Sequence, residues 1–123
     1  MNTYFLYLQQ KSNANYSNEL SFDAANGVGT LSIQGLMKVI NAQDEMLKVD
    51  ICNTNIAESE KLNSNCGADF VKVSQRVPEE FNVIPLRRCV SVDGDADRVI
   101  YFYADGAHKF CMLDGDRIAT LSK

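Results

Sequence analysis

The feature that most constrains this chain is the hexapeptide at residues 93–98, Asp-Gly-Asp-Ala-Asp-Arg, which places three carboxylates at alternate positions and an arginine directly after them. Runs rich in β-branched and aromatic residues flank it, at 89–92 and 99–103. Such runs predict strands, so the hexapeptide is expected to be a turn between two strands. We expect Gly94 to supply the tight bend that points the acids at one spot.

Three carboxylates in one turn repel one another. At ~4 to 5 Å and an effective dielectric constant of ~20, each pair of Asp93, Asp95 and Asp97 costs about 3 to 4 kcal/mol, which water or a cation has to relieve. Oxygen ligands favour a hard ion, Mg²⁺ or Ca²⁺, over zinc or copper. An EF-hand begins with the same alternation, but it requires Gly where this chain has Arg98 and Glu where it has Ala104, so that alternative is excluded.

The arginine indicates which type of metal site to expect. A guanidinium beside a metal is repelled unless an anion lies between them, and phosphate suits that place because arginine binds it bidentately. Metal plus arginine is typical of phosphoryl transfer. The alternative is a solvated acidic turn in which Arg98 is only an ion-pair partner, since short motifs often mislead.

Four stretches, in the same order, resemble the α-D-phosphohexomutases. Residues 93–98 resemble the metal-binding loop of that family, and residues 23–29 are similar to the strand-to-helix turn that opens its second domain. Residues 66–78 resemble a segment of the phosphoacetylglucosamine mutase branch, and residues 113–121 resemble the segment after the metal loop. The resemblance covers about residues 19–123.

The resemblance implies an α/β fold with a mixed sheet and flanking helices, like the second of that family's four domains. It also implies a set of site residues with Mg²⁺ as the cofactor. These are Asp93, Asp95 and Asp97 as metal ligands, Arg98 for phosphate, and Asp69 and Lys72 as possible supporting residues near the cleft.

In the complete family reaction, phosphate moves between the 6 and 1 positions of N-acetylglucosamine phosphate. A serine in a Ser-His-Asn-Pro motif carries the phosphoryl group, and here His108 lies between Ala107 and Lys109 instead. The chain alone is therefore expected to contribute the Mg²⁺-binding loop, to hold no catalytic residue and to be inactive. The alternatives are a phosphomannomutase or phosphoglucomutase relative, or a non-catalytic module that binds metal or a partner.

Composition excludes several other classes. The hydrophobic content of 46% and charged content of 23% predict a globular chain rather than a disordered one. With a net charge of −4 and no basic cluster larger than 87–88, nucleic acid is not expected as a partner. The apolar patch at 4–8 is too short for a membrane span or a signal-peptide core. Cys52, Cys66, Cys89 and Cys111 lack metal-site spacing and predict reduced, mostly buried thiols in a cytoplasmic protein.

The remaining pattern predicts the secondary structure. Helices are expected at 2–10 and about 30–42, a short helix or turn at 67–75, strands at 20–23, 47–52, 88–92, 98–103 and 110–113, and a last helix capped by Asp116. The helix at 30–42 is expected to present an apolar face made by Leu31, Leu36, Val39 and Ile40. Gly27 and Gly29 suggest a nucleotide-binding turn, but Ser32 occupies the third position, where that motif needs Gly or Ala.

Two parts are expected along the chain. Residues 1–18 resemble a helix and linker remnant, and residues 19–123 a domain that is cut short at its C-terminal end. Sugar phosphate is expected as a partner only together with the missing domains. Because apolar patches meant for those domains would be exposed, we expect the chain to self-associate.

Overall fold

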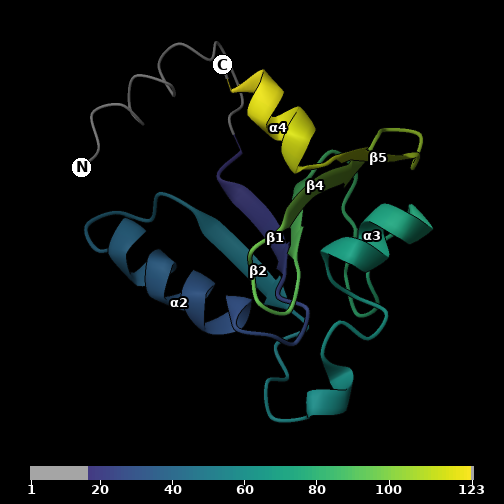
Figure 1. The fold of residues 1–123 in the computed structure, drawn as a ribbon. Coiled ribbons are helices and arrows are strands. Elements are labelled where there is room, and N and C mark those ends of the chain that lie inside the picture. Colours follow the sequence, from purple (N-terminus) through teal and green to yellow (C-terminus); the bar gives the residue numbers. More distant parts are fainter. Residues whose placement is uncertain (1–16, 123) are drawn as a thin grey trace.

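The structure, a computed structural model, describes residues 17–122 (Figure 1). Its centre is a five-stranded sheet in the order β2-β1-β3-β4-β5. The strands are β1 (Glu19–Asp23), β2 (Lys48–Cys52), β3 (Arg88–Val92), β4 (Val99–Ala104) and β5 (Phe110–Leu113). β1 pairs in parallel with β2 and β3, whereas β3, β4 and β5 pair antiparallel. The predicted mixed α/β sheet is confirmed.

Helices cover both faces of this sheet. They are α2 (Gly29–Ile40), α3 (Ala68–Ser74) and α4 (Gly115–Leu121), with a 3-10 turn at Ser59–Lys61. The chain leaves β1 to one side for β2 and returns past β1 to β3, so right-handed crossovers put α2 and α3 on opposite faces (Figure 1). The helix predicted at 2–10 lies outside the described residues.

The two faces of the sheet carry separate cores. Toward α3, a buried cluster contains Val71, Cys89 and Phe102. Toward α2, a second cluster contains Ile33 and Val92. Cys89 and Val92 both come from β3, and side chains alternate between faces along a strand, so this one strand serves both cores.

The apolar face predicted for α2 is not the one that packs on the sheet. The side chains of Leu31 and Val39 are 60% and 76% exposed, whereas Ile33 is buried and Met37 packs against the sheet. The reason is the close approach of Gly29 to β3, where a β-carbon would lie 2.9 Å from the Val92 side chain. That approach fixes the rotation of the helix, so the line spaced by four residues from Gly29 faces inward.

The N-cap predicted for the last helix was also wrong. Asp114, not Asp116, caps α4, because its Oδ1 accepts a hydrogen bond from the backbone N–H of Arg117 over 3.0 Å. Asp116 lies in the first turn, where a carboxylate still interacts favourably with the helix dipole.

The four cysteines carry free thiols, with Cys66 and Cys89 buried. Burial raises the pKa of Cys66 to about 12 and that of Cys89 to about 11, so neither is a thiolate nucleophile at neutral pH. Within residues 17–122, every helix is too short or too polar to cross a bilayer.

Candidate metal centre

The acidic hexapeptide lies at the point where the strand order of the sheet reverses, between β1 and β3. β1 and β3 are parallel neighbours, and the loops at 24–28 and 93–98 follow their carboxyl ends. The two loops touch, since the backbone N–H of Val28 donates to the carbonyl oxygen of Gly94 over 3.1 Å. In open α/β sheets, the crevice at such a reversal of strand order is where ligands bind.

The turn itself is built differently from the prediction. The turn is closed by the backbone carbonyl oxygen of Asp93, which accepts the backbone N–H of Ala96 over 2.9 Å. Ala96 adopts a φ of 59°. The left-handed residue is therefore Ala96, and Gly94 has no positive φ. A β-carbon at position 94 would lie 2.7 Å from the side chain of Leu62, which is exposed and would have to move aside.

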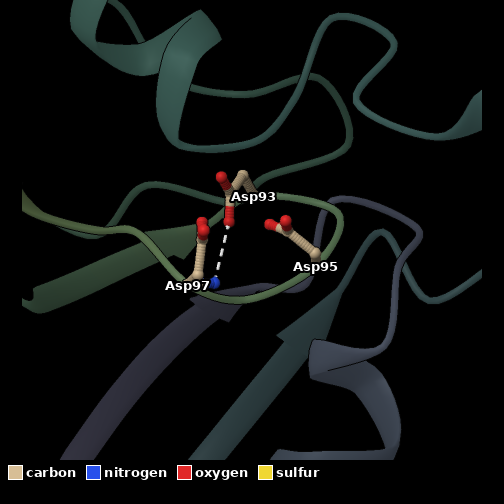
Figure 2. A group of neighbouring side chains, drawn as sticks. All are labelled: Asp93, Asp95 and Asp97. Carbon is tan, nitrogen blue, oxygen red and sulfur yellow. Dashed lines mark hydrogen bonds between the residues drawn. The ribbon is translucent and has the colours of Figure 1, made fainter.

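The three carboxylates of the turn point toward one another (Figure 2). One oxygen from each of Asp93, Asp95 and Asp97 lies within 4.8 Å of the other two. Asp93 is 4% exposed, whereas the other two are exposed to solvent. Asp93 Oδ1 accepts the backbone N–H groups of Asp97 and Arg98, each over 3.2 Å, which fixes it as the anchored member of the group.

The electrostatics of the group are unbalanced. Burial alone would raise the pKa of Asp93, but the hydrogen bonds from the side chain and backbone of Arg98 outweigh it, and the net pKa is lowered. The pKa of Asp97 is raised, because it shares hydrogen bonds with Asp93 and Asp95 and feels their negative charge. The carboxylates therefore crowd one another in a way that a bound cation relieves.

The donor set fits a hard divalent cation. All three side chains offer oxygen, the ligand type of Mg²⁺ and Ca²⁺. Oxygens that share one Mg²⁺ at about 2.1 Å lie no more than about 4.2 Å apart, and those that share one Ca²⁺ reach about 5 Å. The three oxygens lie within 4.8 Å of one another, which is inside the span of Ca²⁺ and close to that of Mg²⁺.

Arg98 joins the turn to helix α3. Its Nε donates to Asp93 Oδ2 over 2.6 Å, and its Nη1 and Nη2 donate to the two oxygens of Asp69 over 2.5 and 2.8 Å. The two flanking carboxylates raise the pKa of the guanidinium, so it stays protonated. Lys72, the other predicted supporting residue, lines a cavity of about 260 Å³ together with Asp69 and Arg98.

The sequence analysis missed Asp23, a buried carboxylate at the end of β1. It is fully buried and accepts four hydrogen bonds that join β1 to three other segments. The donors are the backbone N–H groups of Ala25 (3.0 Å) and Gly67 (2.7 Å), Asn53 Nδ2 (2.9 Å) and Ser91 Oγ (2.6 Å). The signal was an acid directly after the apolar end of a strand. Asp23 holds the start of α3, and thus Asp69, beside the turn.

Comparison with known proteins identifies the family of the chain. The family model of phosphoacetylglucosamine mutase AMG1, domain II, matches residues 1–100. The chain belongs to the phosphoacetylglucosamine mutase family. Phosphoacetylglucosamine mutase 2 of Schizosaccharomyces pombe is 48% identical over 99 residues, which are 80% of this chain and 18% of that protein. The human phosphoacetylglucosamine mutase is 41% identical over 102 residues, 83% of this chain and 18% of its own length.

Solved structures of the phosphoacetylglucosamine mutase family share the fold. The Aspergillus fumigatus N-acetylphosphoglucosamine mutase, in complex with GlcNAc-6P and magnesium, superposes with a TM-score of 0.80 at 41% identity, over 90% of this chain and 22% of that chain. An N-acetylglucosamine-phosphate mutase of the α-D-phosphohexomutase superfamily, in its product complex, gives a TM-score of 0.82 at 35% identity. The present chain therefore spans about a fifth of the length of these relatives.

Proposed function

We propose that this chain supplies the Mg²⁺-binding domain of a phosphoacetylglucosamine mutase, which interconverts N-acetylglucosamine 6-phosphate and 1-phosphate. Asp93, Asp95 and Asp97 would hold the metal, and Arg98 would bind the phosphate. When bound, the cation supplies charge stabilisation for the phosphoryl group in transfer. The chain would perform this role only together with domains that carry a phosphate-accepting serine.

The convergence of three carboxylates at the end of β3 carries the proposal. Their crowding costs free energy unless a cation is present, and the chain adds a guanidinium next to them. The family relative from A. fumigatus was solved with magnesium and GlcNAc-6P, which supports the same cation and substrate here. Arginine beside a cation is the usual equipment for holding a phosphoryl group.

A domain exchange tests this function directly. Residues 19–122 of this chain would replace the matching domain of the S. pombe relative, and mutase activity of the purified chimera would be measured with N-acetylglucosamine 6-phosphate in the presence of Mg²⁺. We expect activity that is lost in Asp95→Ala and retained in Asp44→Ala, since Asp44 is an exposed acid far along the chain from the turn.

The same chimera separates the alternatives. A preference for glucose or mannose phosphates over N-acetylglucosamine phosphate would favour a phosphoglucomutase or phosphomannomutase relative. A folded chimera that binds Mg²⁺ but turns over none of these sugars would favour a non-catalytic module.

A further inference from the structure

Asp69 occupies the part of Arg98 that a phosphate would use. Nη1 and Nη2 of Arg98 donate to both oxygens of Asp69, while Nε donates to Asp93. A guanidinium offers five N–H donors in a planar fork. Three of them are in use, and the paired edge formed by Nη1 and Nη2 is closed to a second bidentate anion.

We propose that Asp69 is an internal competitor for the phosphate position. It holds Arg98 in place and yields the guanidinium to a phosphate once a divalent cation has reached the turn at 93–97. This inference rests on the proposed function, because it takes Arg98 as the phosphate-binding residue, and it adds an order of binding to that function.

The charges around Arg98 explain why the cation has to bind before the phosphate. Without a metal, Asp69 and Asp93 pair with the guanidinium of Arg98, and a carboxylate oxygen of Asp97 lies 3.9 Å from its Nε. Asp95 adds a further negative charge beside Asp93 and Asp97. A phosphate dianion that approaches this excess of negative charge is repelled. A divalent cation at the turn cancels two negative charges, so phosphate can then compete with Asp69 for the guanidinium.

The ion pair is open enough to exchange. The side chains of Arg98 and Asp69 are 57% and 63% exposed, so solvent and salt screen the pair even though it is bidentate. Lys72 lies three residues after Asp69 on α3, and side chains at that spacing are neighbours on a helix surface. Arg98, Asp69 and Lys72 line the same cavity, so Lys72 can pair with Asp69 once phosphate has replaced Asp69 on the guanidinium.

The exchange needs only side-chain movement. Helix α3 is fixed at its start, where the backbone N–H of Gly67 donates to buried Asp23 over 2.7 Å. Val71, in the middle of the helix, is fully buried. Asp69 therefore rotates away from Arg98 on a helix that stays in place.

Inorganic phosphate is the probe for the test. Its binding to the full 123-residue chain would be followed by NMR shifts of the Arg98 Nε–H group and nearby amides, with EDTA and with saturating Mg²⁺. We expect the wild-type affinity to rise about tenfold with Mg²⁺. In EDTA, we expect Asp69→Asn to bind phosphate about three- to fivefold more tightly than wild type, because a competing charge is gone.

Two controls assign the effect. Asp116→Asn removes one charge from the same cavity at a side chain that makes no ion pair with Arg98, and we expect its phosphate affinity in EDTA to stay within about twofold of wild type. In an Arg98→Lys background, Asp69→Asn should give no gain, because the fork is absent.

An unchanged or weaker phosphate affinity of Asp69→Asn in EDTA overturns the inference, as does an equal gain in Asp116→Asn. A separate measurement in the same experiment tests the proposed function. Before phosphate is added, Mg²⁺ should shift the amides of Asp95 and Asp97, and a wild-type chain without those shifts contradicts the metal site itself.

Discussion

Gly27 and Gly94 lie with their backbones in contact at the candidate metal centre. A β-carbon at position 27 would lie 2.3 Å from the carbonyl oxygen of Gly94 and 2.7 Å from its Cα. The loop after β1 and the acidic turn after β3 are thus pressed together with no side chain between them. The glycine that suggested a nucleotide-binding turn instead sets the position of the turn that carries the acids.

Gly27→Ala should therefore destabilise the fold and disturb the turn. The obstacle is backbone, which cannot rotate aside, and overpacking of this kind costs about 1 to 3 kcal/mol. Urea unfolding measures it. Gly35→Ala is the matched control, because a β-carbon there meets nothing within 4 Å, and alanine in a helix interior stabilises by roughly 0.5 to 1 kcal/mol. Equal effects at both positions would contradict the assignment.

Asp23→Ala should be among the most damaging substitutions in the chain. It removes the acceptor of four hydrogen bonds, and of the four donors Asn53 Nδ2 alone has another oxygen acceptor within residues 17–122, the Glu79 carbonyl oxygen. We expect a loss of about 3 to 5 kcal/mol in the free energy of unfolding. Asp44→Ala, at an exposed position, should stay within about 0.5 kcal/mol of wild type. A mild effect of Asp23→Ala in urea unfolding would show that water replaces the carboxylate.

The contribution of Asp93 to stability should depend on pH. Its pKa in the folded state lies below the ordinary value of 3.8, so its contribution to stability is present above that pH and is lost as the pH falls through the folded pKa. We expect the Tm of Asp93→Asn to lie below that of wild type at pH 6, with a difference that shrinks below about pH 4. A constant difference across this range would contradict the assignment.

Asp97 provides the opposite sign as a control for the same pH series. Its pKa is raised in the folded state, so the stability it contributes is present below 3.8 and is lost as the pH rises through the folded pKa. In EDTA at pH 7, Asp97→Asn should melt above wild type, and this difference should vanish at low pH.

The outward face of α2 should drive self-association. Leu31, Leu36 and Val39 are exposed along one side of the helix, and exposed apolar patches promote contact between molecules. We expect Val39→Lys to lower the average mass measured by light scattering at high concentration. Val73→Lys, at a single exposed apolar side chain on α3, should not. A wild-type chain that stays monomeric would remove this expectation.

Much of the fold followed from local pattern. Strands β3 and β5 have the predicted bounds of 88–92 and 110–113, and the ends of β1, β2 and β4 were predicted within one residue. Alternating or β-branched runs fix strands locally. The rotation of α2 could not be predicted, since it depends on the contact of Gly29 with Val92 from a distant strand. The helix has apolar residues on two sides, and the sequence alone does not say which side the sheet covers.

In the candidate site, too, the local part could be predicted from the sequence and the long-range contacts could not. The alternation of Asp93, Asp95 and Asp97 in a turn is local and brings their oxygens together by itself. The ion pair of Arg98 with Asp69 joins residues that are 29 apart in the sequence, and the hydrogen bond of Ser91 to Asp23 joins residues that are 68 apart. Such contacts arise only when the crossover segments have packed on the sheet.

Metal binding by the turn is the central claim, and a thermal melt with Mg²⁺ and with EDTA tests it most directly. At ten times the dissociation constant, we expect the cation to stabilise the wild-type chain by ~1.4 kcal/mol, to stabilise Asp116→Asn equally, and to have no effect on Asp95→Ala. Equal melting of the wild-type chain in Mg²⁺ and EDTA, or an undiminished response of Asp95→Ala, would contradict the assignment of Asp93, Asp95 and Asp97 as the metal ligands.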